Sequence, residues 1–119
     1  MNEEDLAEVA PNRLMYLTTI GRKTSNPHLV EVWFAVREGR IFLSHEGQET
    51  DWMKNIRRNS QVSFEIGGKN FIGRARFLED STEEAWMGKE ALYEKYYSKA
   101  TREVIEDWFS LSKLLVIEL

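Results

Sequence analysis

The sequence predicts an α+β fold, in which six antiparallel strands form a small barrel with flanking helices. Several β-prone segments follow one another closely, and the turn signals Glu38-Gly39 and Gly67-Gly68 join two pairs of them into hairpins. Strands this short bury both faces most easily when their sheet closes into a barrel. The length of 119 residues fits one domain, spanning 1–119.

A short helix is expected over residues 2–10. Asn2 can cap it, acidic side chains fill its first turn, and Leu6 and Val9 lie three residues apart on one face. Pro11 then ends the helix, because proline has no amide hydrogen to donate.

Three strands are expected next, over residues 14–20, 28–36 and 40–44. The first is apolar on both faces, as in a barrel or beneath a helix. Within the second, the adjacent Trp33 and Phe34 point to opposite faces, so one of these rings lies outside the core. An outward aromatic ring indicates a ring-stacking surface or a subunit interface.

A helix over residues 51–58 follows, with Trp52, Asn55 and Ile56 on one face by their spacing of three and four. The rest of the chain is expected to contain, in order, strands over 61–66 and 69–78, helices over 82–98 and 101–109, and a last strand over 114–117. The tryptophans are interpreted as core residues in preference to cofactor contacts, with the first as the best exception: Trp33, Trp52, Trp86 and Trp108.

The loop after the first strand is suited to hold an anion. Gly21 lets the backbone approach closely, Arg22 and Lys23 supply positive charge, and the Thr24 hydroxyl can donate a hydrogen bond. We interpret this hairpin as a grip for the phosphate of a redox cofactor. The alternative is a solvated surface loop that happens to be basic.

Residue content excludes several classes of site. The absence of cysteine excludes disulfides, thiolate nucleophiles and thiolate metal sites. The two histidines lie on different strands without carboxylates at metal spacing, so no metal site is expected. Ser44-His45-Glu46 cannot form a triad, because consecutive strand residues point to opposite faces. No Rossmann or Walker phosphate loop is present either.

An anion-binding loop and many aromatic residues remain, without an acid–base dyad, so no catalytic residue is assigned. An enzyme needs no catalytic side chains of its own when its cofactor carries the chemistry, as in hydride transfer by a flavin.

The net charge of −4 argues against nucleic-acid binding. The acidic start is no signal peptide and no apolar run could span a membrane, so a cytoplasmic protein is expected.

Four motifs occur in a recognisable order: Leu17-Thr18-Thr19-Ile20-Gly21-Arg22-Lys23-Thr24, Trp33-Phe34, Trp52-x-x-Asn55 and Gln61-Val62-Ser63-Phe64. Together they resemble the deazaflavin-dependent nitroreductase family, within the FMN-binding split-barrel proteins related to pyridoxamine 5'-phosphate oxidase. The resemblance covers residues 14–119. It implies a six-stranded split β-barrel of Greek-key type that forms a homodimer, with a deazaflavin (coenzyme F420) or FMN in a groove near the subunit interface.

The resemblance also implies roles by position. Arg22, Lys23 and Thr24 would lie at the phosphate-bearing tail of the cofactor, and His28 falls where a basic residue is expected. The remaining implied positions are Val30, Glu31 and Val32 beside the ring system, Trp33 near the substrate, and Ser44, Trp52 and Asn55 at matching places on the third strand and the following helix.

Two departures from the family pattern bear on the cofactor. Pyridoxamine 5'-phosphate oxidases place an Arg-Lys pair for the FMN phosphate where this sequence has Asp51-Trp52. An acid there would repel a phosphate, which argues against that activity and favours a deazaflavin over FMN. In addition, His45 stands where lysine is expected.

A lid or packing role is open for five aromatic residues: Tyr93, Tyr96, Tyr97, Trp108 and Phe109.

Three functions follow as hypotheses. The first is an oxidoreductase that moves hydride between a reduced deazaflavin or flavin and a small electron acceptor such as a quinone or nitro compound. The second is a carrier or sensor that holds the same cofactor without turnover. The third is a dimeric interaction protein without a ligand, which the aromatic surface and acidic helices would suit.

Overall fold

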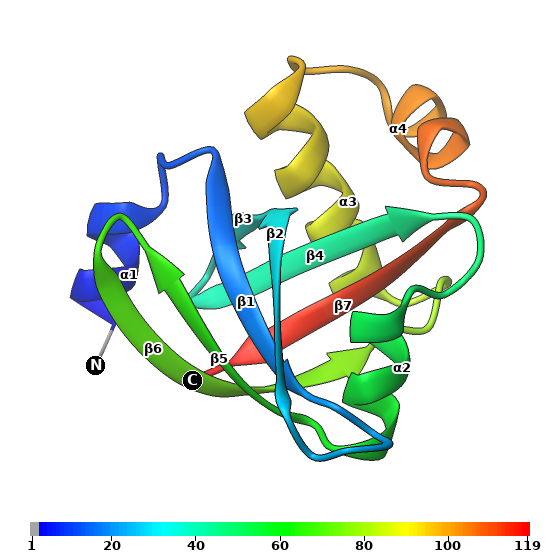
Figure 1. Ribbon diagram of the computed structural model, residues 1–119. Helices are drawn as coiled ribbons and strands as arrows, with labels where there is room; N and C mark the ends of the chain where they lie inside the picture. The colour runs from blue at the N-terminus through cyan, green and yellow to red at the C-terminus, as the bar shows by residue number, and fades with distance from the viewer. Residues whose placement is uncertain (1–2) are drawn as a thin grey trace.

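The computed structural model describes residues 3–119 and contains one twisted sheet with four helices (Figure 1). The elements in chain order are α1 (Glu3–Val9), β1 (Leu14–Ile20), β2 (Pro27–Trp33), β3 (Ala35–Arg37), β4 (Arg40–Glu46), α2 (Asp51–Arg58), β5 (Gln61–Ile66), β6 (Lys69–Phe77), α3 (Glu83–Tyr96), α4 (Arg102–Trp108) and β7 (Ser112–Glu118). The expected cap at Asn2 lies outside the described residues.

All paired strands run antiparallel, in the order β2-β1-β5-β6-β7-β4-β3, which confirms the α+β class. The expectation of six strands was wrong, because the described chain forms seven. The expected barrel was also wrong in that the sheet does not close: β2 and β3 are its two edges.

Both differences arise at Phe34, which divides the strand expected over 28–36. Up to Trp33 the chain pairs with β1, and from Ala35 onward it pairs with β4. Because β3 pairs only with Arg40–Phe42, no strand covers the rest of β4 on that side, and the outer edge of β2 is likewise unpaired. The sheet is therefore split between β2 and the end of β4.

Two apolar layers hold the fold. Inside the curved sheet, α2 buries Trp52, Met53 and Ile56 against residues of β1, β4, β5, β6 and β7. On the opposite side, α3 and α4 cover β4 and β7, where Phe42 and Val116 are fully buried (Figure 1). The Lys89 ammonium joins the two covering helices, since its Nζ lies 2.5 Å from Asp80 Oδ1 and 2.6 Å from Glu106 Oε1.

Within residues 3–119, no helix covers the outer face of β2, β1, β5 and β6. Tyr16, Leu29 and Ile72 are 42%, 66% and 57% exposed there and line a shallow cavity of about 590 Å³. The expectation that residues 14–20 are covered on both faces was therefore wrong. Among the described residues, none of the helices is long and apolar enough to cross a membrane.

Candidate functional site

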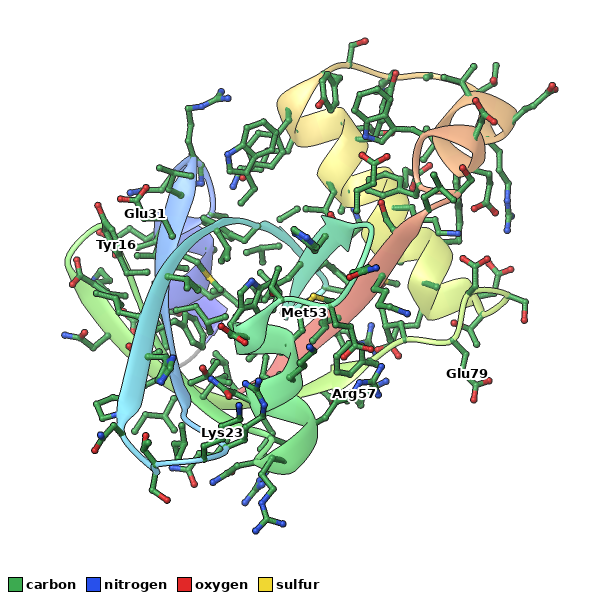
Figure 2. All side chains as sticks on the ribbon, turned by 45° about the vertical axis from the view of Figure 1, so that its right-hand side comes forward. Tyr16, Lys23, Glu31, Met53, Arg57 and Glu79 are labelled. Carbon is green, nitrogen blue, oxygen red and sulfur yellow. The ribbon has the colours of Figure 1, made fainter. Side chains whose placement is uncertain are left out.

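A cavity of about 180 Å³ lies between the β1–β2 loop and the start of α2. We call it the anion pocket; its lining residues are Gly21, Arg22, Lys23, Thr24, His28, Asp51 and Asn55. Figure 2 shows Lys23 on this loop beside α2. The Gly21 amide donates to Asn26 O at 2.8 Å, and a Cβ at Gly21 would lie only 2.8 Å from that oxygen, so the tight loop requires glycine.

Asn55 fixes the loop to the helix. It is fully buried; its Oδ1 accepts hydrogen bonds from Arg22 N at 3.1 Å and Arg22 Nη1 at 2.9 Å. Its Nδ2 donates to Thr19 Oγ1 at 3.1 Å, and Thr19 is itself fully buried in β1. Both the oxygen and the nitrogen of the Asn55 amide therefore have hydrogen-bond partners, as a polar side chain buried on the inner face of α2 requires.

The two cations of the loop differ in their surroundings. Arg22 Nη2 forms an ion pair with Asp51 Oδ1 at 3.2 Å. Lys23 makes no ion pair with any of residues 3–119 and is exposed. Because Asp51 offsets the charge of Arg22, the net positive charge of the pocket comes from Lys23.

A second cavity, of about 530 Å³, lies farther along β2. We call it the edge groove; it is lined by Val30, Glu31, Val32, Trp33, Ser44, His45, Glu46, Trp52, Trp108, Phe109 and Ser112. It occupies the split in the sheet, between the unpaired edge of β2 and the end of β4. The unpaired backbone N–H and C=O groups of β2 can hydrogen-bond the polar edge of a flat ring placed there.

Aromatic rings bound one end of the edge groove. Trp33 is 47% exposed and stacks on Tyr96, while Trp108 is 53% exposed and makes edge contacts with Tyr93 and Tyr97. The expectation that one ring of the Trp33-Phe34 pair lies outside the core is confirmed, since Trp33 is exposed and Phe34 is buried. The interpretation as a core residue was wrong for Trp108, whereas Trp52 is 7% exposed and belongs to the core.

Lys95 is the neighbour of Tyr96 in α3, and its pKa is altered. Burial, together with the nearby charge of Arg13, lowers the pKa of Lys95 to about 8. Burial also raises the pKa of the Tyr96 hydroxyl, although its hydrogen bond to the Phe34 backbone opposes this.

All eleven residues proposed from the sequence line these two cavities. Arg22, Lys23, Thr24, His28 and Asn55 lie in the anion pocket; Val30, Glu31, Val32, Trp33, Ser44 and Trp52 lie in the edge groove. Their role in binding a cofactor stays a prediction. Among residues 3–119, no three histidine or acidic side chains gather closely enough to hold a metal ion.

Sequence reasoning did not assign several residues that line the cavities. Asp51 was considered only as an obstacle to phosphate, and the structure pairs it with Arg22. His45 and Glu46 continue β4 past Ser44 into the edge groove, and Ser112 faces them from β7. Trp108 was considered for a lid or packing role, but nothing in the sequence placed its helix beside β2.

The model of the F420H(2)-dependent quinone reductase family matches residues 5–105. The chain belongs to this family. The match confirms the resemblance and the expected class of cofactor, a deazaflavin or flavin, and it makes the protein a member of a family of F420H(2)-dependent oxidoreductases. None of the curated proteins matches the sequence significantly.

Solved structures support the same fold. The conserved hypothetical protein Rv2991 from Mycobacterium tuberculosis is 26% identical, with a TM-score of 0.77 over 98% of this chain and 79% of that one. An F420-H2 dependent reductase, FDR-A, is 22% identical, with a TM-score of 0.70 over 89% and 94% of the two chains. A protein from Listeria innocua described as a pyridoxamine 5'-phosphate oxidase is 20% identical, with a TM-score of 0.66 over 97% and 90%.

Proposed function

We propose that this member of the F420H(2)-dependent quinone reductase family transfers hydride between reduced F420 and a small electrophile, with a quinone as the first candidate and a nitro compound as the second. One observation carries the proposal: the unpaired edge of β2 runs from the anion pocket into the edge groove, so one extended ligand with an anionic tail and a flat ring could lie along it.

The residues present fit such a cofactor. Arg22, Lys23, Thr24 and His28 offer cationic and hydrogen-bonding groups to a phosphate. The edge groove offers backbone donors and acceptors along β2, with Trp52 at its base and aromatic rings at one end. Bound there, a reduced deazaflavin supplies the hydride. The chain would hold the tail, orient the ring and keep water away from the acceptor.

The experiment is turnover with defined partners. The purified protein is mixed with reduced F420 and a water-soluble benzoquinone, and oxidation of the cofactor is followed by its absorbance, with reduced FMN run in parallel. Saturable, protein-dependent oxidation of F420H(2) supports the proposal. Tight cofactor binding without turnover of a quinone or a nitro compound would favour the carrier or sensor function. If neither cofactor binds, the hypothesis of a dimeric interaction protein without a ligand remains.

We also propose that the protein is a homodimer and that a second copy covers the outer face of β2, β1, β5 and β6. Tyr16 pairs across strands with Glu31 on one side and Glu65 on the other, at one end of this face (Figure 2 labels Tyr16 and Glu31). Arg74 lies toward the other end, opposite Gln61. Within residues 3–119 these two acids and Arg74 form no ion pair, so antiparallel stacking of two copies would bring opposite charges together around an apolar centre.

A further inference from the structure

The indole of Trp33 is supported from behind by α3. Its ring stacks on the ring of Tyr96 with centroids 4.3 Å apart and an angle of 16° between the planes. Trp33 lines the edge groove, whereas Tyr96 does not. Since one face of the indole lies against Tyr96, a ligand in the groove can meet only its other face or its edges.

Tyr96 is itself anchored at the bend between β2 and β3. Its hydroxyl accepts a hydrogen bond from Phe34 N at 3.0 Å and lies 2.8 Å from Phe34 O and 2.7 Å from Arg13 O, so its one proton can go to either carbonyl. Lys95 Nζ donates to Phe34 O at 2.8 Å and to Asn12 O at 2.6 Å. The end of α3 thus holds the backbone next to Trp33 and stacks on its side chain.

A cation borders the stacked pair. The Arg13 guanidinium lies 5.4 Å from the Tyr96 ring centroid and 5.9 Å from that of Trp33, within the range of cation–π attraction. A half-exposed tryptophan would otherwise sample several rotamers. Stacking, the anchored hydroxyl and Arg13 together favour one of them.

We propose that Tyr96 is a positioning residue that orients the Trp33 indole as a wall of the edge groove, ready to meet a flat aromatic ring. It acts through Trp33 and touches no ligand. A wall ordered before binding spares the ligand the entropy cost of ordering it. The nature of the ligand rests on the proposed function, but the coupling between the two rings can be measured without any ligand.

The binding test is a double-mutant cycle with oxidised F420 as the probe, using W33L, Y96L and the double variant. We expect W33L and Y96L each to weaken binding about tenfold, and the double variant to bind within about twofold of W33L, because Tyr96 has nothing left to orient. Multiplying effects, with the double variant weakened about a hundredfold, would show that Tyr96 acts independently of Trp33 and would overturn the proposal.

The ligand-free test is near-ultraviolet circular dichroism, in which the Trp33 contribution is the difference between each protein and its W33L counterpart. That contribution should collapse in Y96L, persist in Y96F, which keeps the stacked ring, and be unchanged in the control Y97L. The Tyr97 ring meets the rings of Tyr93 and Trp108, and among residues 3–119 the ring stacked on Trp33 is that of Tyr96. An intact Trp33 signal in Y96L would overturn the proposal even if F420 binds. If the wild type binds neither F420 nor FMN, the proposed function fails, and the dichroism still decides whether Tyr96 orients Trp33.

Discussion

Asp51 places a negative charge inside a pocket that otherwise suits an anion. Its carboxylate pairs with Arg22, and Arg22 is in turn bonded to the buried Asn55. The Asp51 side chain is 75% exposed, so solvent screens the pair and its contribution to folding is small. Its main effect is therefore expected on the ligand, which it repels.

The substitution D51N should tighten binding of the cofactor. Asparagine keeps an oxygen for the Arg22 guanidinium but removes the charge, so we expect about 3- to 10-fold higher affinity for F420 at low salt, and a smaller gain at high salt because screening weakens the repulsion. Fluorescence titration at two salt concentrations measures this. Equal or weaker binding by D51N at low salt would mean that the carboxylate holds Arg22 in place more than it repels the ligand.

At the scale of the elements, the packing of α3 on β4 depends on a small residue. A Cβ added to Gly88 would lie 2.6 Å from Cδ1 of the buried Phe42. G88A is therefore expected to lower the free energy of unfolding by about 1–3 kcal/mol, even though alanine is the better helix former. Urea unfolding of G88A beside the wild type measures the effect. Unchanged stability in G88A would show that α3 can shift away from the sheet.

The end of α3 should also make stability depend on pH. The pKa of Lys95 falls from an ordinary 10.5 to about 8 on folding, so between pH 8 and pH 10 the unfolded chain binds more protons than the folded one. Stability contributed by Lys95 therefore rises with pH across this window, by about 1 kcal/mol after allowance for solvent screening. Above pH 10 the raised pKa of Tyr96 acts in the opposite direction. Unfolding at pH 8 and pH 10 should show the rise in the wild type and not in K95M; the same rise in both would assign it to another group.

Local patterns predicted most helices and strands, because turns, caps and periodicity are local properties. The face of α3 that packs on the sheet was not predicted. It consists of Ala85, Gly88, Ala91 and Leu92. These residues are mainly small, and they give a weaker apolar pattern than the large aromatic residues of the same helix. The break at Phe34 was missed for a related reason: residues 28–36 read as one β-prone run. Its backbone bonds to Tyr96 come from 62 residues away and leave no trace in the local sequence.

The residues of the candidate site also fall into two groups, those that local sequence predicts and those that depend on tertiary contacts. The loop of Arg22 and Lys23 and the helix position of Asn55 could be read from local spacing and a family motif. The contribution of Trp108 and Ser112 could not, because it depends on how α4 and β7 return to the split between β2 and β4. Likewise, Asp51 could be recognised as acidic, but its pairing with Arg22 is a tertiary contact.

At the scale of the whole molecule, the uncovered outer face makes the dimer testable. L29K places a charge on a side chain that is 66% exposed at the apolar centre of this face, and it should convert the dimer to a monomer without unfolding it. L111K is the matched control, because Leu111 is 69% exposed but lies outside this face, after α4. Light scattering after gel filtration measures the mass. A monomeric wild type, or a dimeric L29K, would contradict the proposed interface.

Titration of F420 into R22A, beside wild type and R58A, tests the whole account most directly. Arg22 lines the anion pocket, while Arg58 is an exposed cation on α2 that does not line it. The wild type should bind saturably, R22A should bind about 5- to 150-fold more weakly, corresponding to about 1–3 kcal/mol for one charge-assisted hydrogen bond, and R58A should stay within about twofold of the wild type. Equal affinity in R22A and the wild type, or no saturable binding at all, would contradict the proposal that a deazaflavin binds with its tail in the anion pocket.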